Sequence, residues 1–445
     1  MNIRTTLGAI SLATVLALST TGCGGGSSSD TTTQTAEITT AQKTAVLTSY
    51  ADIALANYTD SLNDAKALVT ALKAFTDAPT DATLTAAKEA WLTSRESYGQ
   101  TEIFRLSDGP IDAEEGFAAS WDAPEGQLNA WPLDENMIDY TTDENGDTTS
   151  GNIIDTAGEF TPTGDGATKV DATTINKETL AALNENGGEA NVATGYHAIE
   201  FLLWGQDQDY ANFTADSVTQ GALVAGERPL EDYTTNANAD RRKAFLNAAA
   251  ELIVDDLTKM VEAWTAGTGS YREAFLGSGS NAIAQDTALK NIMSGMGIFI
   301  KSELANERIA VAVLTPSEED EHSCFSDNTH RDVDLDYIGF KNVLKGTYNG
   351  TAYGTSMYSL LSDAQKTSLD ELITSIDTKV KTIDEQAKSV EHFDYQIKDD
   401  SANKSNIVAA KNELRDLGDE MITVAKEYGI TLTSEDVTDS EETQI

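Results

Sequence analysis

The chain has 445 residues, of which 40% are hydrophobic and 7% aromatic, enough apolar material for sizeable cores and for two or three domains. Its 73 acidic and 30 basic side chains give a formal net charge of −43, which repels phosphate backbones and anionic lipid headgroups. This balance argues against nucleic acid as a partner and is typical of a solvated acidic exterior.

The amino terminus has the pattern of an export signal. Arg4 precedes an apolar run over residues 7–18, too short to span a membrane, and the sequence STTGC that follows ends at Cys23. A cysteine after a small residue resembles the lipobox of bacterial lipoproteins, although Thr20 stands where leucine is usual. We therefore predict a lipoprotein signal peptide over residues 1–22, acylation of Cys23 and a flexible tether over residues 23–38. Ordinary secretion without lipidation is the alternative.

Helical spacing begins at residue 39. Apolar residues recur every three or four positions over residues 46–72, and the sequence PTD that starts at Pro79 ends this helix and caps the next, which continues toward Phe104. Further helices are predicted at residues 176–184, 240–264, 288–314, 359–391 and 403–428. Irregular connections are predicted at residues 109–131, 141–174 and 315–334. No stretch alternates long enough to require a sheet, so the predicted fold class is all-α, with the helices in bundles.

The two halves of the chain are predicted to be related by duplication. Residues 195–205, GYHAIEFLLWG, align with residues 336–346, DYIGFKNVLKG, with the tyrosine, one leucine and the final glycine in register. This alignment predicts a first bundle over residues 39–265, a second, related bundle over residues 266–430 and an acidic tail over residues 431–445. Ile338 and Lys341 would replace His197 and Glu200 in the second copy, so bundle packing does not require that pair.

His197 and Glu200 are candidate metal ligands. Residues three apart on a helix share a face, so both side chains can address one ion, and Trp204 would wall the same face. Imidazole and carboxylate donors suit iron, zinc or manganese. Further metal ligands are predicted from the following residues: Glu96, Glu102, Asp327 and His330. The alternative is that His197 and Glu200 form a hydrogen-bonded structural pair.

The segment EDEHSCFSDNTHRD, residues 319–332, is a second cluster of donors. It holds His322, Cys324, Asp327 and His330, a mixed nitrogen, sulfur and oxygen set whose spacing matches no standard zinc knuckle. Cys324 is expected to be buried or metal-bound, because an exposed reduced thiol would oxidise in the cell envelope. The sequence has no HExxH, Walker or GxSxG motif, which leaves ordinary zinc-protease and serine-hydrolase mechanisms unsupported.

Several stretches together resemble the imelysin family, and in particular its iron-regulated branch. They are GxHxxE at residues 195–200, RESYGQTE at 95–102, GPID at 109–112, KSELANER at 301–308 and EHSCFSDNTHRD at 321–332. The resemblance covers residues 39–428 and implies two duplicated helical bundles, a family site in the cleft between them, placement in the bacterial envelope and a link to iron uptake. The family is catalogued with metallopeptidases, but this chain lacks the second histidine of a familiar protease helix.

Three functions follow as hypotheses. The favoured one is a lipid-anchored envelope protein, on the periplasmic side of the outer membrane or at the cell surface, that binds iron, zinc or a metal complex and serves uptake machinery. The side chains expected to contact its cargo are Arg95, Tyr98, Trp204, Glu303, Glu307 and Arg308. A metallopeptidase with Glu200 or Glu102 as general base is the second hypothesis. A non-catalytic protein that binds an envelope partner is the third.

Overall fold

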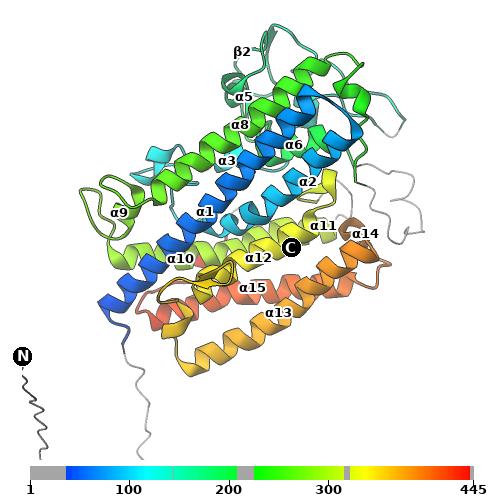
Figure 1. The fold of residues 1–445 in the computed structure, drawn as a ribbon. Coiled ribbons are helices and arrows are strands. Elements are labelled where there is room, and N and C mark those ends of the chain that lie inside the picture. Colours follow the sequence, from blue (N-terminus) through cyan, green and yellow to red (C-terminus); the bar gives the residue numbers. More distant parts are fainter. Residues whose placement is uncertain (1–36, 144, 208–224, 315–320, 441–445) are drawn as a thin grey trace, which may run out of the picture. The chain divides into compact units, whose positions relative to one another are not determined.

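The computed structural model describes residues 37–143, 145–207, 225–314 and 321–440, and the residues from Glu37 onward form one compact unit. The prediction of an all-α fold is confirmed (Figure 1). Within the described ranges, strands occur only as two antiparallel pairs of two residues each. β1 (Glu159–Phe160) pairs with β2 (Val170–Asp171), and β3 (Thr347–Tyr348) pairs with β4 (Thr351–Ala352). No described helix has both the length and the apolar composition needed to cross a bilayer.

A first group of helices comes from the amino-terminal half. It consists of α1 (Thr40–Asp77), α2 (Asp81–Tyr98), α6 (Gly195–Trp204) and α8 (Ala239–Trp264). Helix α1 packs against both α2 and α8, and α6 packs against α2 and α8. Capping boxes start α1 at Thr39 and α2 at Thr80, where each threonine accepts a backbone N–H and stabilises an otherwise unpaired helix end. Every residue of α6 is buried, which explains its unbroken apolar run.

A second group comes from the carboxyl-terminal half. It consists of α10 (Gln285–Ile298), the π-helix η4 (Phe299–Ala310), α11 (Val311–Leu314), α12 (Thr329–Lys345), α13 (Asp363–Ser389) and α15 (Lys404–Glu427). Helix α15 contacts α10, η4 and α13, while α12 contacts α13. In Figure 1 these helices, drawn from yellow-green to red, lie below α2, α6 and α8. The relation of the two groups by duplication, and the boundary at residue 265, stay predictions.

The two groups meet where backbone approaches backbone. Helix α2 continues into the 3₁₀-helix η1 (Gly99–Phe104), which packs against α12. A Cβ atom added at Gly339 would lie 2.7 Å from the carbonyl oxygen of Gln100, and one at Gly99 would lie 2.9 Å from the Leu335 Cβ. Glycine at both positions therefore permits the close packing that joins the halves beside the site.

Short elements fill the connections. They are η2 (Ala118–Trp121), α3 (Glu125–Leu128), α4 (Glu135–Ile138), α5 (Lys177–Leu183), η3 (Leu230–Tyr233), α9 (Tyr271–Phe275), η6 (Cys324–Ser326), η7 (Tyr358–Leu360), α14 (Phe393–Gln396) and η8 (Glu435–Val437). One expectation needs correction. Residues 315–334 are not wholly irregular, because α12 begins at Thr329 and includes His330. Part of the expected acidic tail packs on α10 and α15, where Val437 is fully buried.

Candidate functional site

His197 and Glu200 lie together in the interior on α6. The His197 Nδ1 and Glu200 Oε2 atoms share a hydrogen bond of 2.9 Å, and neither side chain is exposed. The other oxygen of Glu200, Oε1, accepts hydrogen bonds from the backbone N–H of Ser326 at 3.0 Å and from its hydroxyl at 2.6 Å. The second ring nitrogen of His197, Nε2, has no hydrogen-bond partner among the described residues. A buried polar atom without a partner is costly unless something binds it.

A second histidine–carboxylate pair faces the first. The Nδ1 atom of His322 lies 2.8 Å from Oδ2 of Asp332, which also accepts a hydrogen bond from the Ser323 hydroxyl. The other oxygen of Asp332 accepts a hydrogen bond of 2.9 Å from Arg95. The imidazole rings of His197 and His322 are 4.7 Å apart between centroids and nearly perpendicular, at 83°. The fold thus brings together two imidazoles, each oriented by a buried carboxylate.

Trp131 covers both rings. Its centroid is 4.8 Å from that of His197 and 6.4 Å from that of His322. The sequence predicts Trp204, not Trp131, as the aromatic wall beside His197. Trp204 instead packs edge-on against Trp91, with Lys88 over its ring.

Burial sets the protonation of the two imidazoles. Burial, followed by the nearby His322, lowers the pKa of His197 well below its usual value, and burial together with Arg308 lowers the pKa of His322 to about 4. Both rings are therefore neutral near pH 7, the form that binds metals. Burial raises the pKa of Glu200 to about 8 despite the donors of Ser326. Burial acts on Asp332 in the same direction, but Arg95, His322 and Ser323 together outweigh it and hold the pKa of Asp332 well below its ordinary range.

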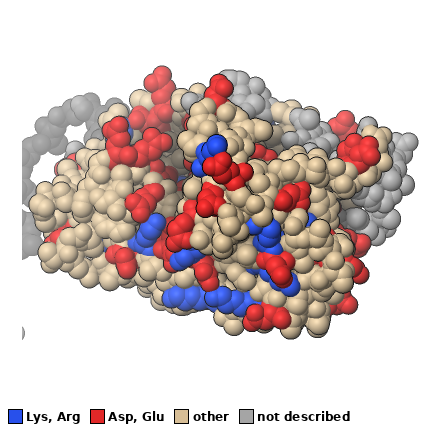
Figure 2. Space-filling view, turned by 90° about the horizontal axis from the view of Figure 1, so that it is seen from above, with Lys and Arg blue, Asp and Glu red and all other residues tan. Residues whose placement is uncertain are grey.

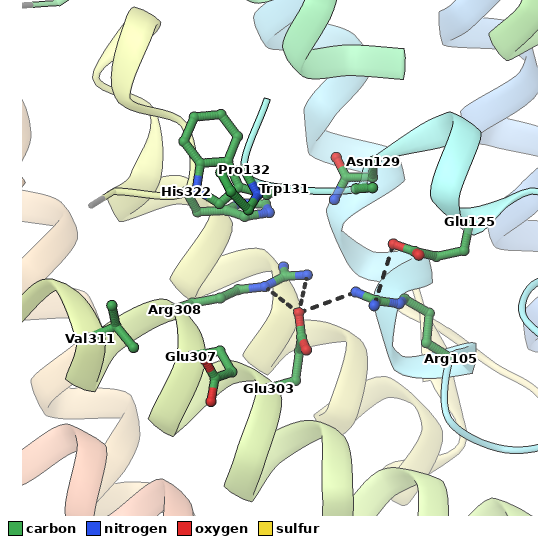
Figure 3. A pocket seen from close by; sticks show the side chains of 11 residues that line it. Arg105, Glu125, Asn129, Trp131, Pro132, Glu303, Glu307, Arg308, Val311 and His322 are labelled. Atoms are coloured by element: carbon green, nitrogen blue, oxygen red, sulfur yellow. Dashed lines mark hydrogen bonds and ion pairs between the residues drawn. The ribbon is translucent and has the colours of Figure 1, made fainter. Parts of the chain in front are cut away.

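A charged pocket of about 400 Å³ reaches His322 and Trp131, which line it (Figure 3). It is lined by Arg105, Glu125, Asn129, Ala130, Trp131, Pro132, Glu303, Glu307, Arg308, Val311 and His322. Glu303 lies between the two arginines: its Oε1 is 2.9 Å from Nη2 of Arg308 and 3.2 Å from Nη1 of Arg105. Burial opposes ionisation of Glu303, yet these two guanidinium groups lower its pKa to about 2.

The π-helix η4 sets the register of one wall of the pocket. Backbone hydrogen bonds in a π-helix join residues five apart, which places such residues on successive turns and close to one another. Glu303 and Arg308 are such a pair and contact one another directly. An α-helix would align residue 303 with 306 or 307 instead.

Glu102 lies at the centre of the buried ion network beneath the pocket. Its Oε2 atom is 2.6 Å from Nη2 of Arg308 and 3.2 Å from Nη1 of Arg105. Burial opposes ionisation of Glu102, but Arg308 and then Arg105 outweigh it and lower its pKa. Asn129 donates to Glu102 and accepts from Arg95, which joins this network to Asp332 and so to His322.

The family model for imelysin, Peptidase_M75, matches residues 54–421. The chain belongs to the imelysin family. A curated relative from Synechococcus elongatus, named iron-regulated protein A, is 26% identical over 313 residues, which cover 68% of this chain. The match covers 64% of that relative, so this chain spans less than two thirds of its length.

Two solved structures share the fold of this imelysin. An iron-regulated protein A precursor from Parabacteroides distasonis superposes with a TM-score of 0.61 at 19% identity, covering 89% of this chain and 97% of the other. An imelysin-like protein from Psychrobacter arcticum gives a TM-score of 0.55 at 11% identity, covering 89% of this chain and 98% of the other. At these identities the likeness concerns the fold.

The imelysin does not gather all of its predicted metal ligands in one place. Glu96 is half-exposed and forms an ion pair of 2.8 Å with Arg331. Asp327 lies 3.2 Å from His392, while His330 contacts the backbone oxygen of Asp327 at 3.0 Å. Glu102 binds arginines, as described above. Of the predicted set, His197 and Glu200 contact one another, and the His197 ring lies against His322, which lines the pocket.

The predicted cargo-binding residues of the imelysin divide in the same way. Glu303, Glu307 and Arg308 line the pocket. Arg95 is buried behind it, with its guanidinium 5.4 Å from the ring of Tyr98, and Tyr98 packs on Tyr196. Neither Arg95 nor Tyr98 is among the pocket-lining residues, so their contacts orient Asp332 and α6.

Sequence reasoning missed the partners of His197 in the imelysin. The segment 321–332 is rich in donors, but these donors separate in the fold. His322 faces His197, Asp327 and His330 lie near His392, and Cys324 is a buried free cysteine. Trp131 and Asn129 carried no motif. The one signal in the sequence was the scarcity of histidine, since the chain has only four. The structure places these four histidines in two close pairs.

Proposed function

We propose that this imelysin binds a transition-metal ion through Nε2 of His197 and Nε2 of His322, at the edge of the charged pocket. The observation that carries the proposal is the buried, unpartnered Nε2 of His197 beside a second neutral imidazole. Metal-binding histidines usually donate the other ring N–H to a carboxylate or carbonyl, which fixes the tautomer and the ring direction. Asp332 occupies that position for His322 as a carboxylate, and Glu200 occupies it for His197 once Glu200 ionises.

Iron is the first candidate and zinc the second. Imidazole nitrogen is a ligand for both metals, and carboxylate or water oxygen would complete the shell from the pocket side. The name of the Synechococcus relative, iron-regulated protein A, supports iron over zinc. A metal complex would use the same open side, which the pocket provides.

Binding is favoured over peptide hydrolysis by the state of the two carboxylates that hydrolysis would use. Glu102 is held by Arg105 and Arg308, and Glu200 by His197 and Ser326. A general base needs to reach the proton that it removes, and both groups are already held by these partners. Neither Glu102 nor Glu200 is among the residues that line the pocket.

Metal titration of the purified protein tests this proposal. We expect Zn²⁺, and Fe²⁺ without oxygen, to bind to the wild type, and we expect His197→Ala and His322→Ala each to lose one bound equivalent in calorimetry. Glu200→Gln should weaken that site by about 10–100-fold, the usual effect of losing a carboxylate that orients a ligand. Glu96→Gln is the matched control, because Glu96 pairs with Arg331 near the surface. Unchanged stoichiometry in both histidine variants would refute the site.

We further propose that the protein is anchored in the bacterial envelope through Cys23, where it would pass metal to uptake machinery. Support comes from the lipobox-like sequence and the glycine- and serine-rich tether, which lie outside the described residues. Fractionation of cells that express Cys23→Ser tests the anchor. The variant should move from the membrane to the soluble envelope fraction, and equal membrane retention of both proteins would contradict lipidation.

A further inference from the structure

A second group of potential metal ligands lies where segment 321–328 meets the start of α14. Asp327, His392 and Asp394 each offer a donor atom within 4.8 Å of the other two, and their exposed fractions are 3%, 3% and 4%. This is the one such group of three among the described residues. His197 and His322 are not part of it.

The atoms of this group approach to ion-pair distance without forming an aligned hydrogen bond. The Nδ1 atom of His392 lies 3.2 Å from Oδ2 of Asp327, yet the two do not form a hydrogen bond. Neither ring nitrogen of His392 has a hydrogen-bond partner among the described residues, and Oδ2 of Asp327 has none. Lone pairs that converge at this distance in the interior mark a place for a cation between them.

No lysine or arginine of the described chain forms an ion pair with Asp327 or Asp394. The neighbouring cations have other partners: Arg331 and Lys388 both bind Asp384. His330 contacts the backbone oxygen of Asp327 through Nδ1, and its Nε2 lies 3.8 Å from Asp384. Two buried carboxyl groups therefore share a single histidine, and a bound cation would compensate their charge.

Two segments that are far apart in the sequence supply the donors. Asp327 is the left-handed residue, at φ 58°, that links η6 to α12. His392 precedes α14 and Asp394 is in its first turn. Gln396 fastens α14 by donating to the backbone oxygens of Ile383 and Glu391, at 3.1 and 2.9 Å. This closed, buried arrangement is typical of structural rather than catalytic metal sites.

We propose that Asp327, His392 and Asp394 form a structural site for a divalent first-row transition metal. One imidazole and two carboxylates suit Zn²⁺, Mn²⁺ or Fe²⁺ better than the all-oxygen sites of Ca²⁺ or the thiolate sites of Cu⁺. The ion would join α14 to segment 321–328. Because Ser326, next to Asp327, donates twice to Glu200, the ion would also hold the carboxylate that orients His197.

The test uses the full chain with His197→Ala, so that the remaining binding reports this site. After removal of metal by a chelator, this variant should bind one equivalent of Zn²⁺ in calorimetry, and its melting temperature should rise on reloading. Adding Asp394→Asn, or separately His392→Gln, should abolish both effects. Asp399→Asn is the matched control, because Asp399 is exposed and pairs with Lys404, and it should retain both effects.

The result that overturns the proposal is a His197→Ala protein that binds no Zn²⁺, or one that binds it equally well with Asp394→Asn and with His392→Gln. If both double variants fail to fold, Zn²⁺ titration of the metal-free His197→Ala protein still tests the proposal by itself. Failure of the His197 and His322 site is distinguishable, since it would leave the stoichiometry of His197→Ala equal to that of the wild type.

Discussion

Gly195 shows how a single residue positions the site. It begins α6 with φ of 79°, a conformation that side chains other than glycine rarely adopt. A Cβ atom at this position would lie 2.2 Å from the carbonyl oxygen of Leu128. This contact holds residues 127–129 against the start of α6, and the next residues along that segment include Trp131, which covers His197. The positive φ and this close contact therefore explain why the first residue of the GxHxxE motif is glycine.

Gly195→Ala should destabilise the protein and disturb the cover of His197. Backbone strain alone is worth about 1–3 kcal/mol, and the clash with Leu128 adds to it. Urea unfolding at neutral pH would measure the loss of free energy of unfolding, and tryptophan fluorescence would report a change around Trp131.

Gly267→Ala is the control for this substitution, because nothing lies within 4 Å of a Cβ atom built at Gly267. We expect that change to alter the free energy of unfolding by no more than about 0.5 kcal/mol. Equal stability of the Gly195→Ala protein and the wild type would contradict the steric account.

At the scale of elements, the turn after η1 depends on one carboxyl group. Leu106 and Asp108 both have positive φ, at 60° and 52°. The backbone N–H of Leu106 donates to Oδ2 of Asp112 at 2.5 Å, while Oδ1 of Asp112 is buried without a hydrogen-bond partner among the described residues. Burial raises the pKa of Asp112 to about 6, against the opposing effects of Leu106 and Arg105. The folded turn thus favours the protonated acid.

This raised pKa makes stability depend on pH. A carboxyl group with a raised folded-state pKa contributes stability that is fully present below its unfolded pKa, about 4, and is lost as pH rises through the folded value. For Asp112 the loss is about 2–3 kcal/mol, most of it between pH 4 and 6. Asp112→Asn cannot ionise and should lack this component.

Denaturant unfolding from pH 4 to pH 7 would measure the effect. The stability of the wild type relative to Asp112→Asn should fall as pH rises, whereas Asp240→Asn, at an exposed position, should follow the wild type throughout. A constant difference between the wild type and Asp112→Asn would show that Asp112 does not titrate in this range.

At the scale of the whole molecule, the net charge of −43 dominates the electrostatics. On the face drawn in Figure 2, lysine and arginine side chains lie beside acidic ones and form no separate basic area. Buried arginines such as Arg95 and Arg308 are ion-paired inside, which leaves the acidic excess near the solvent. Self-repulsion of this excess opposes the compact state.

Raising the NaCl concentration should therefore stabilise the protein. Screening weakens the repulsion between exposed carboxylates, whereas buried ion pairs are screened much less. The melting temperature should rise by a few degrees between about 10 mM and about 500 mM NaCl, over which the Debye length falls from about 30 Å to below 8 Å. A melting temperature that is constant or falls over this range would show that exposed ion pairs outweigh the repulsion.

Local patterns in the sequence determined the fold class and one contact of the site. The apolar spacing of residues 46–72 and of α8 was sufficient to predict helices, because a helix needs only its own periodicity to define a buried face. The contact between His197 and Glu200 was also predictable, since residues three apart on a helix share a face wherever that helix packs.

Tertiary structure decided the rest of the site. His322 reaches His197, Asp332 is fixed by Arg95, and Glu102 is bound by arginines, each across a long stretch of chain. The π-helical register of η4 and the cover by Trp131 likewise carry no local signal. The physical reason is that periodicity specifies which face of an element is buried but not which residues it will meet there. That choice depends on how all the elements pack together at once.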